Sequence, residues 1–363
     1  MKTVSPVDQS SFLFKTSDNV ANEIVQFRNR VKEETAEDSL VIPFITDIHL
    51  GLLPKNLKNL KKASFEHIEN FVNVCNLIDH DLVVQNGDLN DGSSLDVEDF
   101  WAANQSYKQK MKSIIKPIVN VRGNHDDNSL ADIYAENDLE KVASYKDIKN
   151  FFFDDYFTKG NLITDKSDKM YGYIDVKGVR IIFIDLFDSR QEVGSDGKTK
   201  FPLVTSGGCI QQTQVDWLID TLKNTPATHS VLFIAHTAPA DVYDVANTIN
   251  TDVVSLIIKA YLNGSSYNFS GTNKDFPIEI EGAFSGKRKI IAFLHGHRHR
   301  DEVTVIKGTD VKCIGLLCSK TESNSSYTFR DFGTRYEDSF NVLLIDKGNI
   351  KILRFGAGGD INV

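Results

Sequence analysis

The chain has 363 residues, of which 41% are hydrophobic and 25% charged, and its 50 acidic and 41 basic side chains give a formal net charge of −9. These values are typical of a globular protein that is long enough to bury a large core. The acidic balance disfavours a general nucleic-acid or anionic-membrane surface, and no apolar stretch approaches the ~20 residues that span a bilayer.

The start of the chain and its cysteines bear on location. Residues 1–20 lack the basic segment and the apolar run of a secretory signal. The four cysteines are scattered without a C-x-x-C pair, which predicts buried reduced thiols and no cysteine-based zinc site. We expect a cytoplasmic protein, or one carried in a phage particle, with no membrane partner. No feature of the sequence indicates a particular oligomeric state.

The first predicted elements are a helix and a strand. Residues 18–37 predict a helix, because Asp18 can cap it and a hydrophobic stripe follows at helical spacing. The apolar run 40–46 predicts a strand that ends at Asp47. Pro43 predicts that the first half of this strand is irregular or lies at a sheet edge.

Further short apolar runs rich in β-branched residues predict strands that are buried on both faces. Helical stretches at 59–79 and 96–115 separate the first of them, which gives a βαβαβ order and an α/β fold with a parallel sheet. Ligands of such sheets bind outside the carboxyl ends of the strands. The predicted strands are 82–84, 117–121, 179–184, 231–235 and 290–294.

Two longer segments, 127–175 and 240–288, are less regular. We interpret them as cap-like insertions over a site and not as separate domains. The second includes a predicted helix at 250–262 and a Gly/Ser/Asn-rich stretch at 263–274, for which we expect no regular structure.

The tail, 301–363, alternates apolar runs with turns and predicts several strands that close a second sheet. The candidate ligands described next extend from residue 47 to residue 299, and a domain boundary inside that span would divide the site. We therefore expect an N-terminal helical extension, 1–39, followed by one domain, 40–363.

Five short clusters of Asp, Asn and His follow the apolar runs. Taken singly, each has an ordinary explanation as a helix cap, a turn or a hydrogen-bonded core histidine. Two histidines at i and i+2, as in 296–299, point the same way when the segment is extended. Carboxylate, amide and imidazole groups brought from several strand ends to one place are what a two-metal hydrolytic site needs. The clusters are Asp47-Ile48-His49, Gly87-Asp88-Leu89-Asn90-Asp91, Gly123-Asn124-His125-Asp126, His236 and Gly296-His297-Arg298-His299.

In this order, the five clusters resemble those of the calcineurin-like metallophosphoesterases, over about residues 40–300. The resemblance implies a two-sheet β-sandwich with flanking helices and a site for two divalent metal ions, for which Mn²⁺, Fe²⁺ and Zn²⁺ suit the mixed ligands. Asp88 would bridge the two ions. The first ion would be held by Asp47, His49, Asp88 and His299, and the second by Asp88, Asn124, His236 and His297.

The resemblance also implies roles for two further residues. In the family, a water between the ions becomes a hydroxide that attacks phosphorus in line with the leaving group. His125 follows a ligand without being one, and it would protonate the leaving alkoxide or stabilise the transition state. Asp91 would be the carboxylate partner that fixes the His125 ring, unless it is only a turn residue.

Several neighbours of the clusters are weaker candidates. Asn90, Arg122 and Arg298 could contact a substrate phosphate. The alternatives are that Asn90 shapes its turn and that the arginines pair with surface carboxylates. His295 would lie behind the ligands and support them. The histidines that match no cluster, and that we expect to be structural or at the surface, are His67, His80 and His229.

Motif residues that differ from those of two branches of the family narrow the range of expected functions. Ser/Thr protein phosphatases have Arg-Gly where this chain has Gly92-Ser93 and a Glu at Asp126, so protein dephosphorylation is disfavoured. Purple acid phosphatases have a tyrosine ligand at the position of Asp91 and lack the first histidine, which excludes a tyrosinate–ferric site. Segment 207–218 resembles a helix of cyclic-nucleotide-phosphodiesterase-like and acid-phosphatase-like members, and the ending 338–358 resembles bacterial and phage members.

The leading hypothesis is a metal-dependent phosphodiesterase or phosphomonoesterase that acts on a small phosphoester. A nuclease is the second hypothesis, because residues 47–51 are similar to a motif of recombination-repair nucleases, although the acidic charge disfavours a nucleic-acid partner. A third is a non-catalytic metal-binding protein. Retention of all seven predicted ligands and of His125 argues against it.

Overall fold

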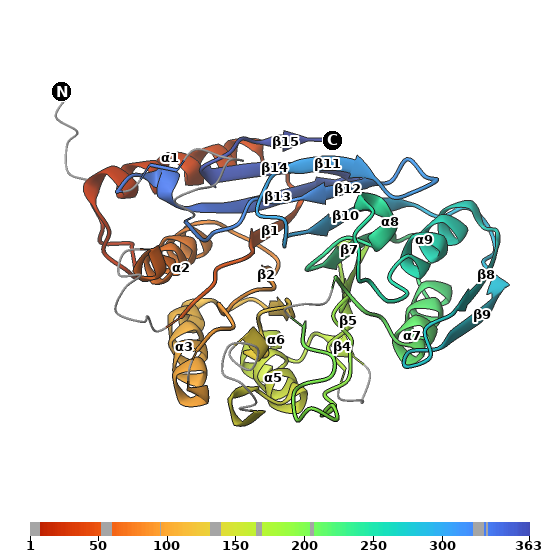
Figure 1. Cartoon of the computed structure of the whole chain (residues 1–363). Coiled ribbons are helices and arrows are strands. Elements are labelled where there is room, and N and C mark those ends of the chain that lie inside the picture. Colours follow the sequence, from red (N-terminus) through yellow and green to blue (C-terminus); the bar gives the residue numbers. More distant parts are fainter. Residues whose placement is uncertain are drawn as a thin grey trace.

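Two β-sheets stacked face to face form the centre of the molecule, and helices cover their outer faces (Figure 1). The structure is a computed structural model, and it describes residues 8–51, 60–94, 96–130, 139–164, 169–203, 207–321, 330–331 and 333–363. The predicted α/β fold, a two-sheet sandwich with flanking helices, is confirmed.

The first sheet carries three of the five clusters. Its last three strands run parallel, and the third strand is antiparallel to the fourth. The carboxyl ends of the parallel strands therefore meet at one edge, where the clusters that begin at Asp47, Gly87 and Gly123 follow. The strand order is β15 (Ile361–Asn362), β14 (Asn349–Gly356), β13 (Ser339–Asp346), β1 (Leu40–Ile45), β2 (Val83–Asn86) and β3 (Ile118–Val121).

The second sheet carries the other two clusters. Its second to fifth strands are parallel and its edge strands are antiparallel. His236 and the cluster at 296–299 follow two of the parallel strands. The strand order is β11 (Glu302–Val305), β12 (Lys312–Gly315), β10 (Ile290–His295), β7 (Ser230–Ala235), β6 (Val179–Ile184), β5 (Gly172–Val176) and β4 (Ile163–Thr164).

We expected the strands of the tail to close a second sheet, but they divide between the two sheets. Its strands β11 and β12 extend the second sheet, whereas β13, β14 and β15 complete the first. Strand β13 is buried along almost its whole length and pairs with β1 from Leu40↔Ile345 to Phe44↔Asn341. A strand that is apolar on both faces suits an interior position, but periodicity alone does not say which sheet it joins.

Alternation along β1 shows why its sequence is continuously apolar. Leu40, Ile42 and Phe44 belong to the core between the two sheets. Val41 and Ile45 point the other way, into the core beneath the helices. Because both faces of the strand are covered, no position is left for a polar side chain.

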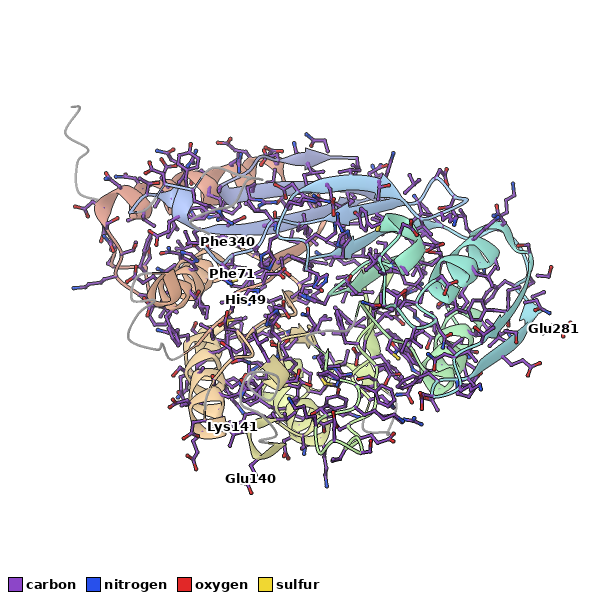
Figure 2. All side chains as sticks on the ribbon, viewed as in Figure 1. His49, Phe71, Glu140, Lys141, Glu281 and Phe340 are labelled. Carbon is purple, nitrogen blue, oxygen red and sulfur yellow. The ribbon has the colours of Figure 1, made fainter. Side chains whose placement is uncertain are left out.

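The helices over the first sheet share one core with it. In Figure 2, Phe71 and Phe340 lie close together in this core, and their ring centroids are 5.3 Å apart. Phe27 of the N-terminal region 1–39 packs on Phe340 and Phe355, so that region contributes to the same core. The helices are α1 (Asp18–Glu34), α2 (Leu60–Leu77), α3 (Val97–Lys110), α5 (Tyr145–Phe152) and α6 (Asp155–Thr158).

The cap of α1 differs from the expected one. Ser17 is the N-cap, with φ −63° and ψ 150°, and its side chain accepts a hydrogen bond from the amide of Val20. Asp18 is the first helical residue. Both residue types favour helix starts, and the backbone of Ser17 places its hydroxyl within reach of the free amide.

The second sheet is covered by α7 (Gln212–Lys223), α9 (Val253–Asn263) and a β-hairpin. The helix predicted at 250–262 is confirmed. The stretch 263–274 was expected to lack regular structure, but it contains β8 (Ser266–Gly271), which pairs with β9 (Ile278–Ala283). Only Tyr267 and Phe269 alternate with polar residues in this strand, and two aromatic residues are too few to indicate a strand from the sequence. Short helix α8 (Ala240–Tyr243) precedes α9.

The segment 127–175 is also more regular than expected. It contributes α5, α6, β4 and most of β5. Its residues 131–138 and 165–168 lie outside the described part of the chain. The elements that are described belong to the helical layer and to a sheet edge.

The prediction from Pro43 is confirmed for the first half of β1: the strand lies between β13 and β2, but residues 40–43 pair only with β13. Val41 lies two residues before Pro43 and Asp47 lies four residues after it. Their amides donate to Asp81 and Gly87, on the side of the strand that faces β2. By alternation the missing N–H of Pro43 faces that side, and pairing with β2 begins only at Phe44↔Val84. The proline therefore removes no ladder hydrogen bond.

All four cysteines are buried free thiols. Among the described residues, no helix is both long enough and apolar enough to cross a membrane.

Candidate metal centre

The predicted ligands lie in the loops that follow β1, β2, β3, β7 and β10. Left-handed backbone is costly for residues with a side chain, and it persists where surrounding contacts hold it, often at functional sites. These loops therefore hold strained conformations that aim the side chains at one point. The predicted ligands with positive φ are Asp47 (52°), His49 (52°), Asp88 (50°), His297 (63°) and His299 (53°).

The segment 296–299 is not extended, which corrects the expectation from its i, i+2 spacing. His297 and His299 both have left-handed backbone, so the chain bends at each of them. The amide of His297 donates to the carboxylate oxygens of Asp47, both at 3.1 Å, and this anchors the bend. The two histidines consequently reach different parts of the cluster.

The first group consists of Asp47, His49, Asp88 and His299. Each offers a ligand atom, and these atoms lie within 4.8 Å of one another. Nε2 of His299 is 3.2 Å from Oδ1 of Asp47 and 3.1 Å from Nε2 of His49. Nε2 of His49 is 3.6 Å from Oδ2 of Asp88. Two carboxylates and two imidazoles in this arrangement suit one divalent cation.

The second group consists of Asp88, His236 and His297, again with ligand atoms within 4.8 Å of one another. Nε2 of His236 lies 3.2 Å from Oδ2 of Asp88. Nδ1 of His236 donates to the carbonyl oxygen of Asn86 at 2.7 Å, because a carbonyl can only accept. With Nδ1 bound to this carbonyl, Nε2 is the ring atom that faces Asp88, which is the arrangement of metal-binding histidines. Asp88 belongs to both groups.

Asn124 lies next to these groups, after β3. Its side chain is buried, and its Oδ1 has no hydrogen-bond partner among the described residues. Nε2 of His236 is a second buried atom in this condition. Buried polar atoms without partners are costly in a folded protein, and a bound cation would satisfy both. The donor set therefore fits two divalent ions.

The electrostatics of the cluster favour a cation. Burial lowers the pKa of His49 and of His297 to about 4, which leaves neutral imidazoles with a lone pair. Burial also lowers the pKa of His236, but the charges of Asp88 and Asp47 outweigh it and raise the pKa to about 9. The two carboxylates thus hold a proton on His236, a position that a divalent cation would take over.

The family model of the calcineurin-like phosphoesterases matches residues 40–301. The chain belongs to this family. The match includes all five clusters, and the order of the ligand groups along the chain is the one that the resemblance implied. None of the curated protein sequences matches the chain.

The solved structure of a phosphatase shares the fold of this calcineurin-like phosphoesterase. A dimetal phosphatase from Danio rerio has 13% identical residues and a TM-score of 0.56, and the alignment covers 89% of this chain and 98% of that chain. A purple acid phosphatase from yellow lupin, Lupinus luteus, has 11% identity and a TM-score of 0.46, with 87% of this chain and 51% of that chain covered. At these identities the likeness concerns the fold.

His125 lies beside the cluster, and its contact with Asp91 differs from the expected one. Nδ1 of His125 is 2.7 Å from the main-chain carbonyl oxygen of Asp91. The Asp91 carboxylate points elsewhere: its Oδ1 is 3.6 Å from Nδ1 of His49 and 3.6 Å from Nζ of Lys320, and its Oδ2 accepts from the hydroxyl of Ser93 at 2.8 Å. Asp91 therefore orients His125 through its backbone and not through its carboxylate.

The turn after Asp91 explains this difference. The amide of Asp91 donates to the carbonyl oxygen of Leu50 at 2.7 Å, which aligns the two loops. Gly92 then turns with φ +71°, and a Cβ at this position would lie 2.7 Å from the carbonyl oxygen of His125. The backbone consequently approaches His125 while the Asp91 side chain faces His49.

Asn90 and Arg122 are buried beside the cluster, and contact of either with a substrate phosphate stays a prediction. The buried amide of Asn90 donates to Oδ1 of Asn104 at 3.1 Å. The buried guanidinium of Arg122 donates to Asp185 at 2.5 Å and lies 4.2 Å from the ring centroid of Tyr145. Its Nε has no hydrogen-bond partner among the described residues.

Arg298 is partly exposed. Its Nε lies 2.5 Å from Oε1 of Glu302, and its guanidinium covers the ring of Tyr243. His295 is buried, with Nε2 3.0 Å from the hydroxyl of Tyr243, and its support of the ligands stays a prediction. Contact between Arg298 and substrate stays a prediction.

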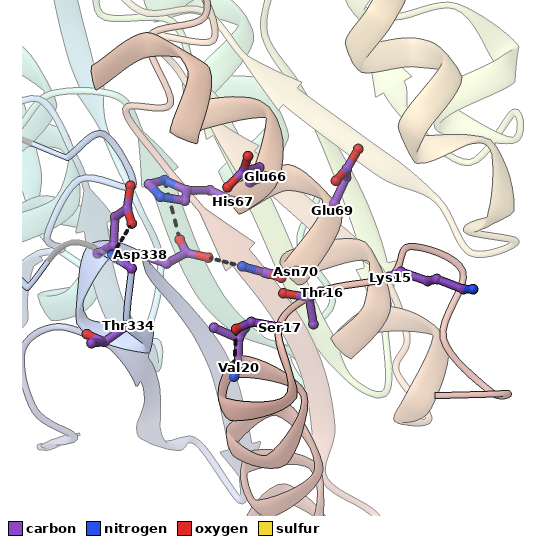
Figure 3. A pocket seen from close by; sticks show the side chains of 12 residues that line it. Lys15, Thr16, Ser17, Val20, Glu66, His67, Glu69, Asn70, Thr334 and Asp338 are labelled. Carbon is purple, nitrogen blue, oxygen red and sulfur yellow. Dashed lines mark hydrogen bonds and ion pairs between the residues drawn. The ribbon is translucent and has the colours of Figure 1, made fainter. Parts of the chain in front are cut away.

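The other histidines are outside the cluster. His80 is buried against the carbonyl of Ile78, and His229 is partly exposed. His67 lines a cavity of about 390 Å³ between α2 and the segment before β13 (Figure 3). Its Nδ1 is 3.7 Å from Oδ1 of Asp338, whose other oxygen accepts from Asn70.

Sequence reasoning missed the groups that hold the ligands in place. The hydroxyl of Thr46 donates to Asp47 at 2.6 Å, and the carboxylate of Asp126 accepts the amides of Asn90 and Gly123. Asp126 thus connects the loops that carry Asp88 and Asn124. The available signal was position: Thr46 is next to a cluster and Asp126 belongs to one. Their roles could not be predicted, because the hydrogen bonds of Asp126 cross between loops.

Proposed function

We propose that the chain is a metal-dependent phosphoesterase that hydrolyses a small phosphodiester or phosphomonoester at this cluster. The observation that carries the proposal is the pair of ligand groups that share Asp88, in a chain of the calcineurin-like phosphoesterase family. Two ions held by one bridging carboxylate form the arrangement that enzymes use to hold both the attacking and the leaving oxygen of a phosphoryl group.

The seven predicted ligands divide between the two ions. Asp47, His49 and His299 would hold the first, Asn124, His236 and His297 the second, and Asp88 both. When bound, the ions would supply positive charge for the phosphoryl oxygens and would lower the pKa of a coordinated water, so that it becomes a nucleophile near neutral pH.

Hydrogen bonds within the chain orient the two carboxylates. Asp47 accepts from Thr46 and from the amide of His297, and Asp88 accepts from the amide of His125 at 3.0 Å. These donors hold the carboxylates in fixed orientations before any ligand binds, which reduces the reorganisation that binding requires.

His125 is the proposed general acid. Because its Nδ1 donates to the Asp91 carbonyl, Nε2 is the atom that gains and loses the exchangeable proton. Nε2 lies 4.0 Å from Oδ2 of Asp88, and the side chain is 21% exposed. A proton on Nε2 is thus next to the cluster and open to a leaving alkoxide.

A substrate panel tests the proposal. Protein supplemented with Mn²⁺ is assayed on bis-p-nitrophenyl phosphate, p-nitrophenyl phosphate, cyclic nucleotides and glycerophosphodiesters, and His297→Ala is compared with the matched control His229→Ala. We expect hydrolysis of at least one small ester, loss of it in His297→Ala and retention in His229→Ala. Full activity in His297→Ala, or no hydrolysis of any ester by wild type, would overturn the proposal.

The panel also includes single-stranded and double-stranded DNA and RNA. Preferential cleavage of nucleic acid would replace the small-ester assignment by the nuclease alternative. Metal binding without hydrolysis of any substrate would favour the non-catalytic alternative. The net charge of −9 supports the expectation that small esters are preferred.

A further inference from the structure

Lys320 approaches the cluster from a segment that carries none of the five motifs. After β12 the chain runs beside the end of β1, where the amide of Ser319 donates to the carbonyl of Thr46 and the amide of Lys320 donates to the carbonyl of Asp47, both at 2.9 Å. These two bonds hold the backbone of Lys320 next to a predicted ligand. The position of the lysine is therefore defined by the sheet.

The ammonium group of Lys320 lies on the side of the cluster that carries His125. Its Nζ is 3.6 Å from Oδ1 of Asp91, and the same oxygen is 3.6 Å from Nδ1 of His49. The rings of His49 and His125 are 4.9 Å apart, and the backbone of Asp91 binds His125. If His125 protonates the leaving group, Lys320 is on the leaving-group side.

Lys320 keeps its donors available. Its contact with Asp91 is a charge contact that is longer than a hydrogen bond, and its side chain is 27% exposed. Of the two arginines beside the motifs, Arg122 is buried against Asp185, and Arg298 has its Nε 2.5 Å from Oε1 of Glu302. Lys320 is thus a partly exposed cation beside the cluster whose ammonium group can donate to a ligand.

The balance of charges at the site indicates the role of Lys320. Two divalent ions against the carboxylates of Asp47 and Asp88 leave enough positive charge for one phosphoryl group and its nucleophile. No positive charge of the ions would then remain for a second anionic group on the substrate, and the carboxylate of Asp91 would repel that group. Lys320 cancels the charge of Asp91 and offers N–H donors to anionic oxygen.

We propose that Lys320 is a specificity-determining residue that binds a second phosphate group, carried by the leaving group of the substrate. The inference rests on the proposed function and deepens it: the preferred substrates are then diphosphate esters. Hydroxide forms a P–O bond to one phosphorus, the bond from that phosphorus to the bridging oxygen breaks, and the neighbouring phosphate leaves with this oxygen. Lys320 acts on substrate binding and touches no reacting atom.

Binding of two stable anions tests the assignment. Affinities of the Mn²⁺-loaded protein for methylphosphonate and for methylenediphosphonate are measured by calorimetry, with metal content checked before and after. The variants are Lys320→Gln, Lys320→Arg and Lys312→Gln, the last being an exposed lysine at the start of β12 that makes the same change in net charge. The quantity compared is the ratio of the two affinities.

We expect wild type, Lys320→Arg and Lys312→Gln to prefer the diphosphonate, and Lys320→Gln to lose about tenfold of that preference. An unchanged ratio in Lys320→Gln would overturn the inference. So would an equal loss for both anions, because Lys320 would then act through Asp91 and His49. If wild type with its full metal content binds neither anion, the proposed function itself fails.

Discussion

The main-chain carbonyl oxygen of Asp91 accepts a hydrogen bond from Nδ1 of His125 at 2.7 Å, while the carboxylate of Asp91 faces Nδ1 of His49 at 3.6 Å. One residue thus supports the proposed acid with its backbone and a predicted metal ligand with its side chain. Substitutions that keep the backbone separate these two roles.

Asp91→Asn is expected to weaken metal binding and to leave the proton chemistry of His125 in place. The substitution removes the charge beside His49 but keeps the carbonyl that orients His125. Changes to groups that hold a metal-binding histidine typically cost 10–100-fold in metal affinity. Titration with Mn²⁺ should show such a loss, and the pH profile of kcat at saturating metal should keep its shape. If the pH profile of kcat changes and the metal affinity does not, the carboxylate of Asp91 acts on His125 and not on His49.

His125→Gln is expected to slow turnover by about 10²–10⁴-fold for esters with alkyl leaving groups, because an alkoxide needs a proton as it departs. The p-nitrophenolate group leaves without one, so its ester should lose much less. The measurement is kcat for methyl and p-nitrophenyl esters of one phosphoryl group, at equal metal content. Equal losses for the two esters would contradict the assignment of His125 as an acid.

Gly123→Ala is expected to disrupt the cluster while Gly359→Ala leaves it intact. A Cβ at position 123 would lie 2.2 Å from Oδ1 of Asp88 and 2.3 Å from its amide, whereas at position 359 it would meet nothing within 4 Å. Calorimetric titration with Mn²⁺ of the folded variants should show weaker binding for Gly123→Ala alone. Wild-type metal affinity in this variant would show that Asp88 can move without consequence.

The sequence was sufficient to predict the sandwich and that the predicted ligands come together, because side chains on short loops after parallel strands meet at one edge of the sheet. Six of the seven predicted ligands belong to the two groups, and Asn124 lies beside them. It was not sufficient for Asp91, since the choice between its carbonyl and its carboxylate depends on how its loop pairs with Leu50.

Pro43 correctly indicated that the first half of β1 lacks a partner on one side. Other features depend on contacts that no local pattern reveals. The tail strands divide between two sheets, which a pattern of apolar runs cannot reveal. Lys320 carries no motif, and only the folded chain brings it to Asp91.

Asp338→Asn is expected to flatten the pH dependence of stability. Burial raises the pKa of Asp338 to about 8, so the folded protein holds a proton that the unfolded chain releases above about 4. Stability therefore falls as pH rises toward 8 and levels off above it. Burial lowers the pKa of His67 to about 3, so this histidine adds little to the change in stability between pH 6.5 and 8.

Urea unfolding at several pH values within this window gives the comparison. The free energy of unfolding of wild type should fall by about 2 kcal/mol relative to Asp338→Asn across the window. Parallel curves for the two proteins would show that Asp338 is ionised in the folded state.

The metal content of the purified protein, measured by elemental analysis after equilibration with Mn²⁺, tests the central claim most directly. Because Asp88 belongs to both ligand groups, we predict about two ions for each wild-type chain and fewer than one for Asp88→Asn. A wild-type chain that binds no ion, or an Asp88→Asn chain that retains two, would contradict the two-metal account.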